Sequence, residues 1–434
     1  MLVYGSIGMP LAVIGYPIAI WLIPHYSGVL GVSLGAVGTM LMLARISDVI
    51  TDPLIGEASD RYRSSIGRRK PWILAGTPIM MLGIYQLFVP AEGVGALYLL
   101  FWLTVMMLGS TMISLPYGAW GAELSSDYHQ RSRVTATREF YVLGGLLLAA
   151  FVPFLVETFG ERKSGPVLEA LAWTIVLTLP ACVALVLWRV GEPPATGREK
   201  IPLREGLRYM VGNGPLARIL AIILLVTFGE AFRNALSLFF MRDAVGITGI
   251  GTAYLVYFGT GLAAVPLWLR LGRRIGKHRA FAVTMAAVSV ISVAMVFLRE
   301  GDYWPFMALF LAKGFCFGGL QFLPLAMLAD VVDVDSVQSG GRRAGALFAL
   351  SSMTGKLATA FGSGVSVNLV ALAGFDPSGR AGSNGPDELL ALALLYAVAP
   401  AFFFCSALYL TWHFPITAER QAELRSRLES MEDS

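Results

Sequence analysis

Long apolar runs alternate with short polar segments along the whole chain. A helix needs about 20 residues to cross the hydrocarbon layer of a membrane. Runs of roughly this length lie near residues 2–24, 34–55, 73–90, 97–118, 138–157, 168–188, 216–240, 249–269, 280–298, 304–330, 345–372 and 389–412. The pattern predicts an all-α integral membrane protein with twelve transmembrane helices.

A polar segment in the middle of the chain divides these helices into two groups of six. The segment "GEPPATGREKIPLREGLRYMVGNGP" (191–215) is rich in proline, glycine and charge, which is typical of a linker. We therefore predict four parts, namely an N-terminal six-helix bundle (1–190), a cytoplasmic linker (191–215), a C-terminal six-helix bundle (216–412) and a cytoplasmic tail (413–434).

Related motifs recur on the two sides of this linker. The segment "SLPYGAWGAELSSDYHQRSR" resembles "FLPLAMLADVVDVDSVQSGGRR", with Pro116 and Pro324 separated by 208 residues. A weaker match pairs Pro53 with Pro266 at a separation of 213 residues. Helix two thus matches helix eight, and helix four matches helix ten. Two six-helix halves related by a parallel repeat predict the major facilitator superfamily fold, with a solute site near the membrane midplane.

Composition and charge agree with a membrane protein and predict its orientation. Hydrophobic residues make up 56% of the chain and charged residues only 14%. With both termini in the cytoplasm, the inner loops and tail hold 22 Lys and Arg and the outer loops 5, as cytoplasmic loops normally do. We expect a multi-pass protein of the cell (inner) membrane. The net charge of +4 then reflects topology and indicates no nucleic-acid partner.

Cysteine and histidine give no sign of an enzyme. The three cysteines lie in predicted apolar helices, and the four histidines are scattered over helix ends and loops. No spacing could gather a transition metal or build a nucleophile–base pair. We therefore expect neither catalytic residues nor a resident cofactor.

Two acidic residues interrupt the second apolar run. In "ARISDVITDPLIGEASD", Asp48 and Asp52 are four residues apart and share a helix face, with Arg45 one turn earlier. Charged groups inside a membrane are costly and usually functional. The pair needs a cation, which can be Na⁺, a proton or a basic side chain. Lys356, midway along helix eleven, is the best remote partner. The alternative is an ion pair with Arg45 or Lys356 that only joins helices.

Further charges gather at the predicted cytoplasmic ends of helices two, three, ten and eleven. Acid, glycine and arginine residues there can pair across helices and hold one face of the protein shut. The alternative is a basic anchor that only sets topology. The predicted cytoplasmic gate comprises Asp60, Arg61, Arg68, Arg69, Asp330, Arg342 and Arg343.

Three motifs together resemble the glycoside-pentoside-hexuronide:cation symporter family, typified by melibiose permease. They are "ARISDVITDPLIGEASD…GRRKPW", "LPYGAWGAELSSDYHQRSRVTATREF" and "ADVVDVDSV…GRRAGALFALSSMTGK", and the resemblance covers nearly the whole chain. It implies a secondary active transporter that couples Na⁺ or H⁺ to solute uptake by alternating access. It also implies a cation site at Asp48, Asp52 and Thr111, where oxygen ligands suit Na⁺. Arg45 and Lys356 are implied as charge partners.

The resemblance does not extend to the sugar site, because two acids and one aromatic residue that bind the sugar in melibiose permease are replaced here. The matching positions hold Ala12, Ser114 and Gly118. Aromatic and bidentate polar groups near the implied cavity suit a sugar, although each aromatic residue alone can simply pack helices. The predicted substrate-binding residues are Ser114, Tyr117, Trp120, Arg138, Glu139, Tyr141, Glu230, Arg233 and Asn234.

The predicted function is cation-coupled symport of a small polar solute, a sugar or glycoside, by a monomer in the lipid bilayer. The alternative keeps the fold and replaces the solute with an amphipathic lipid such as a lysophospholipid. The lipid-carrying members of the resembling family and the replaced sugar acids motivate this alternative.

Overall fold

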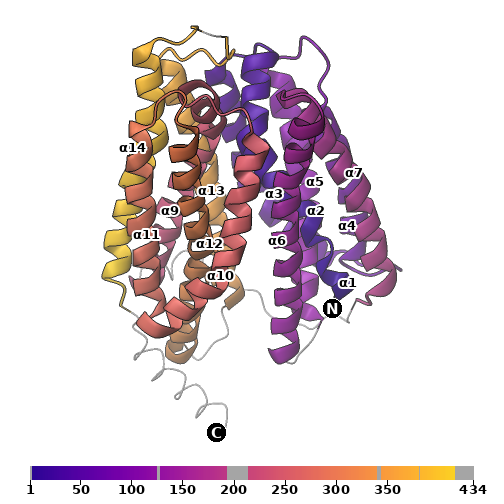
Figure 1. Ribbon diagram of the computed structural model, residues 1–434. Helices are drawn as coiled ribbons and strands as arrows, with labels where there is room; N and C mark the ends of the chain where they lie inside the picture. The colour runs from indigo at the N-terminus through magenta and orange to yellow at the C-terminus, as the bar shows by residue number, and fades with distance from the viewer. Residues whose placement is uncertain (1, 125–127, 193–213, 340–343, 381, 416–434) are drawn as a thin grey trace. The chain divides into compact units, whose positions relative to one another are not determined.

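The computed structural model describes residues 2–124, 128–192, 214–339, 344–380 and 382–415. Every regular element in these ranges is helical, as predicted (Figure 1). Eleven of the helices described there are long and apolar enough to cross a membrane. The remaining predicted span corresponds to α13 (Ala344–Leu372), which has 29 residues but is not among those eleven. The all-α prediction is confirmed. The eleven candidate spans become the predicted twelve when α13 is counted with them.

The first span is irregular. It consists of α1 (Leu2–Gly5), α2 (Gly8–Pro17) and two π-helical segments, η1 (Ile18–Leu22) and η2 (His25–Val29). Proline has no N–H to donate to the preceding turn, so prolines at positions 10, 17 and 24 disturb the regular hydrogen bonding. Wide π turns appear where that ladder is disturbed.

Five long helices complete the first half of the chain. They are α3 (Leu34–Arg61), α4 (Lys70–Phe88), α5 (Ala96–Glu123), α6 (Tyr128–Phe159) and α7 (Ser164–Arg189), coloured indigo to magenta in Figure 1. Helix α4 packs on α5 and α7, α3 packs on α5, and α2 packs on α6. The acid pair of α3 is therefore next to the face of α5.

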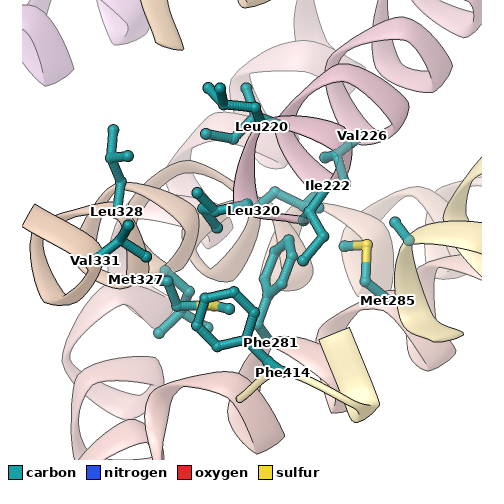
Figure 2. Close-up of a cluster of buried hydrophobic side chains, with 14 of the residues drawn as sticks. Leu220, Ile222, Val226, Phe281, Met285, Leu320, Met327, Leu328, Val331 and Phe414 are labelled. Atoms are coloured by element: carbon teal, nitrogen blue, oxygen red, sulfur yellow. The ribbon is translucent and has the colours of Figure 1, made fainter. Parts of the chain in front are cut away.

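The second half contains a comparable series of helices. They are α9 (Gly214–Phe239), η3 (Phe240–Ala244), α10 (Ile250–Ile275), α11 (Lys277–Ala294), η4 (Met295–Phe297), α12 (Tyr303–Ser339), α13 and α14 (Pro386–Trp412). Figure 2 shows the apolar core of this region, in which Leu220 and Ile222 of α9 meet Phe281 and Met285 of α11 and Leu320 of α12. The four prolines of the internal repeat lie inside α3, α5, α10 and α12, the helices that the repeat pairs.

The chain packs into two compact units, and only one of the boundaries between them lies in the linker. One unit contains residues 1–197, 234–255 and 363–392, and the other contains 198–233, 256–362 and 393–434. Helices α9, α10, α13 and α14 therefore pass from one unit into the other. The division into two bundles at the linker stays a prediction about which parts move together.

Within the first unit, α3 and α13 touch through glycine. A Cβ atom on Gly364 would lie 3.2 Å from the Gly38 carbonyl oxygen and 2.9 Å from the Met42 Cβ atom. A Cβ atom on Gly38 would lie 2.9 Å from Nδ2 of Asn368, which donates to the Gly364 carbonyl at 2.8 Å. The two backbones can approach this closely because neither glycine carries a side chain.

Helices α4 and α5 are equally tight, and this contact gives a test of the packing. A Cβ atom on Gly109 would lie 2.5 Å from the Met80 backbone nitrogen, whereas one on Gly144 of α6 would meet nothing within 4 Å. Alanine is favoured over glycine in a helix interior by about 1 kcal/mol, but overpacking costs roughly 1–3 kcal/mol. We expect Gly109→Ala to lower the thermal unfolding temperature in detergent and Gly144→Ala to leave it unchanged or raise it. Equal effects of the two changes would contradict this account of the contact.

Candidate functional site

The predicted acid pair lies on α3 beside α5, inside the first unit. The Asp48 side chain is only 4% exposed, and its Oδ2 lies 3.9 Å from Nη1 of Arg45. The buried Thr111 hydroxyl of α5 donates a hydrogen bond to Oδ1 of Asp52 at 3.0 Å. The structure thus brings Arg45, Asp48 and Asp52, which share a helix face by their spacing, together with Thr111, which the family resemblance implied.

The composition of this cluster suits a small cation. Two carboxylates and one guanidinium lie together in it. The Thr51 hydroxyl, one turn after Asp48, is buried and has no hydrogen-bond partner among the described residues. Pro53 also cannot donate to the Val49 carbonyl one turn earlier. Carboxylate, hydroxyl and carbonyl oxygens are the ligands that hard cations prefer.

Thr51 was not predicted, although it is next to Asp52 in the sequence. A hydroxyl within one turn of each acid is the signal that could have revealed it. The described residues contain no group of three or more His, Cys, Asp and Glu that could hold a metal ion. Two acids with nearby hydroxyl oxygens are hard ligands of the kind that suit a monovalent cation.

The remote charge partner, Lys356, lies on α13 in the second unit. Asp48 and Asp52 lie in the first unit. A link between the lysine and the acids stays a prediction.

Two predicted substrate residues on α5 are packing residues in this structure. Tyr117 is buried, and its ring stacks on that of Tyr4 with centroids 4.5 Å apart. Trp120 is fully buried, meets Tyr4 edge to face, and donates to the Gly191 carbonyl at 3.2 Å. Neither ring can reach a solute in this conformation. In this structure both rings pack between helices, which is the alternative given above for each aromatic residue.

The predicted substrate residues on α6, and Ser114 of α5, are more accessible. Arg138 and Glu139 form an ion pair at 2.9 Å, and their side chains are 39% and 40% exposed. Tyr141 and Ser114 are partly exposed. Ser114 lies one turn after Thr111 on the same helix. These residues stay candidates for contact with a solute.

The predicted residues of α9 divide into a buried and an accessible part. Arg233 is fully buried and pairs with Glu230, whose side chain is 19% exposed. Nη1 of Arg233 also donates to the Ser292 hydroxyl at 3.4 Å. Lys313 is buried nearby, with Nζ 5.1 Å from the Tyr257 ring centroid. Arg233 therefore supports Glu230 rather than touching a solute in this conformation. Asn234, partly buried, falls in the first unit.

A charge network joins four helices of the first half. Nη1 of Arg69 lies 2.5 Å from Asp60 Oδ1. Arg68 and Arg69 both bind Glu123, at 2.8 and 3.0 Å. Their backbone N–H groups donate to Glu192 Oε1, each at 2.9 Å. The network ties the ends of α3, α5 and α7 to the start of α4.

Only some of the predicted gate residues belong to this network. Asp60, Arg68 and Arg69 belong to this network, but their partners Glu123 and Glu192 were missed because they are distant in sequence. Arg61 instead pairs with the exposed Glu57. Asp330 pairs with Lys277 at 2.6 Å. Arg342 and Arg343 lie outside the described residues.

Two acids allow the network to be tested. Glu123→Ala leaves the buried Arg69 without one of its carboxylate partners, and removing one member of a buried ion pair costs roughly 3–5 kcal/mol. Because the side chain of Glu123 is 22% exposed, we expect a loss of unfolding free energy at the lower end of that range. Glu57→Ala removes an exposed pair and should change stability by less than about 1 kcal/mol.

Unfolding midpoints in detergent, measured for both variants, would check the expected difference. A Glu123→Ala protein as stable as Glu57→Ala would show that the network does not hold these helices together.

Comparison with known proteins bears on the family and the fold of the chain. The family model described as "MFS/sugar transport protein" matches residues 3–418. The chain is 25% identical to the glucuronide carrier protein homolog of Escherichia coli, over 94% of this chain and 90% of that protein. It is 22% identical to the isoprimeverose transporter of Lactiplantibacillus pentosus, with 82% of this chain and 77% of that protein covered.

A lipid transporter is also among the relatives. The chain is 24% identical to the sodium-dependent lysophosphatidylcholine symporter 1-A of Danio rerio, with 91% of this chain and 82% of that protein covered. Sugar-related and lipid-related names thus occur at comparable identity.

Solved structures establish the fold. A bacterial homolog of the human lysosomal transporter Spinster superposes with a TM-score of 0.65 at 13% identity, covering 99% of this chain and 96% of its own. The nucleoside transporter NupG superposes with a TM-score of 0.65 at 14% identity, covering 94% and 99%. The predicted major facilitator fold is confirmed.

Proposed function

The chain belongs to the MFS/sugar transport family, in which its motifs are those of the glycoside-pentoside-hexuronide:cation symporters, and we propose that it carries a sugar or glycoside across the cell membrane together with Na⁺ or H⁺. The protein is a transporter and not an enzyme. The observation that carries the coupling proposal is the cluster on α3, where Thr111 donates to Asp52 beside the buried Asp48.

The donor groups of this cluster support a site for a coupling cation. Carboxylates, a threonine hydroxyl and one guanidinium lie together there, and carboxylate and hydroxyl oxygens suit a single Na⁺ or a proton. The ion is proposed to bind there before the halves move. Lys356 is proposed as the cation that replaces it when the site is empty. Oxygen ligands from Asp48, Asp52, Thr51 and Thr111 favour Na⁺.

The proposed placement has both termini in the cytoplasm of the inner membrane. The excess of Lys and Arg in the loops on that side supports it, with 22 residues against 5. We propose that the protein works as a monomer, with the bilayer as its surroundings. Each major facilitator-type chain contains both halves between which the solute passes.

The solute is proposed to be a sugar, glycoside or sugar acid. The relatives named for a glucuronide and for isoprimeverose support this choice. Partly exposed carboxylates at Glu139 and Glu230 are acceptors suited to sugar hydroxyls, and Arg138 suits a carboxylate. The second candidate is a lysophospholipid, supported by the zebrafish relative and by Ala12, Ser114 and Gly118 at the positions of the permease sugar residues.

The coupling site is tested by Asp48→Asn and Asp52→Asn, with Asp387→Asn on the exposed first turn of α14 as the matched control. Asparagine is nearly isosteric, so packing is kept while a charge is lost. In proteoliposomes we expect both site variants to lose most Na⁺- or H⁺-driven uptake, and the control to match the unmodified protein. Solute binding and downhill exchange should partly survive, because Ser114 and Arg138 are unchanged.

A purely structural acid pair would behave differently. Removing one acid would then leave a buried cation without its partner and lower stability by roughly 3–5 kcal/mol, so the protein would fail to fold rather than fail to couple. A well-folded Asp52→Asn protein with unchanged ion-driven uptake would overturn the coupling proposal.

The solute class is tested by uptake of labelled glucuronides, neutral glycosides and lysophosphatidylcholine into the same proteoliposomes under an imposed Na⁺ or pH gradient. We expect ion-dependent uptake of a sugar compound. Uptake of the lysolipid alone would establish the second candidate instead. Stimulation by a pH gradient in Na⁺-free buffer, equal to that by Na⁺, would overturn the preference for Na⁺.

A further inference from the structure

The end of α6 meets the start of α10 inside the first compact unit. Helix α6 comes from the first six-helix half and α10 from the second, yet residues 234–255 cluster with residues 1–197. Glu157, near the end of α6, is buried, and its Oε2 accepts a hydrogen bond from the Gly251 backbone N–H at 2.8 Å. A carboxylate of one half thus binds the helix start of the other.

The chemistry of this contact is favourable. Helix α10 begins at Ile250, so the Gly251 N–H is one of the first amides that have no partner within the helix. The positive end of the helix dipole lies at the same place, where a carboxylate is stabilised. A charge-assisted bond of this kind is stronger than one between neutral groups.

The surrounding backbone fits around this bond. A Cβ atom on Gly251 would lie 2.3 Å from the Phe154 backbone nitrogen and 2.6 Å from the Pro153 carbonyl carbon. Nη1 of Arg162 donates to the Thr248 hydroxyl at 3.2 Å. The glycine therefore lets the start of α10 lie directly against α6, and residues on both sides of Glu157 hold the same segment.

We propose that Glu157 and the start of α10 form a latch, defined by Glu157, Gly251, Arg162 and Thr248, which holds this end of the transporter closed and must release for solute to pass. The proposal rests on the proposed function, because alternating access requires the two halves to separate at each end in turn. By the predicted orientation this is the outer end, since α10 finishes with Arg273 and Arg274 in a predicted inner loop.

The latch also explains why Glu157 is an acid in an otherwise apolar helix end. In the closed state its charge is met by backbone N–H groups, and in the open state water can replace them. The contact can therefore be made and broken reversibly. Removing it should shift the equilibrium between closed and open by about tenfold.

The test follows the accessibility of Ile250, which is buried in the closed contact. Ile250→Cys is placed in a chain whose Cys182, Cys316 and Cys405 are changed to alanine, and its labelling rate with a polar maleimide is measured in proteoliposomes. Glu157→Ala should raise that rate by about tenfold. Glu157→Gln, which keeps an acceptor without the charge, should raise it less. Glu161→Gln, at an exposed acid paired with Lys163, is the matched control and should not change it.

A second variant covers the case in which Glu157→Ala does not fold. Gly251→Ala should separate α10 from α6 by steric contact alone and raise the labelling rate in the same way. Unchanged labelling in folded Glu157→Ala or Glu157→Gln protein overturns the latch.

The labelling readout needs no solute, so the two proposals can fail separately. Faster labelling without uptake of any sugar or lipid supports the latch and overturns the proposed function. Ion-driven uptake with unchanged labelling does the opposite.

Discussion

A charge inside an apolar helical bundle must be compensated by a nearby group, and the arrangement of this protein follows from that constraint. Asp48 faces Arg45, the fully buried Arg233 faces Glu230, and Glu157 faces the amide groups at a helix start. Each of these contacts fixes the position of one helix against another or against its own next turn. The acid cluster of α3 is the place where an external ion is proposed to join this balance.

The acid cluster could be predicted from the sequence because its geometry is local. Asp48 and Asp52 share a helix face by spacing alone, and the family resemblance added Thr111 from a helix that spacing cannot place. Glu123, Glu192 and Glu157 were not predicted, since each acts through a contact between residues that are more than 50 positions apart. Aromatic residues such as Trp120 were assigned to the solute because sequence does not reveal which side of a helix faces its own bundle.

Coupling and gating use different chemistry in different parts of the first unit. The acid cluster lies in the middle of α3, where the coupling ion is proposed to bind. The contact of Glu157 lies near the end of α6 and pairs its carboxylate with a backbone amide of α10. The two sites share no residue, so communication between them has to pass through movement of whole helices.

The glycine contact between α3 and α13 has a consequence for how this transporter can be tuned. Gly38 and Gly364 let two backbones touch beside the carboxamide of Asn368, so the fit depends on the absence of even one methyl group. Side-chain volume at these two positions therefore sets how closely α3 and α13 can approach, independent of any charge.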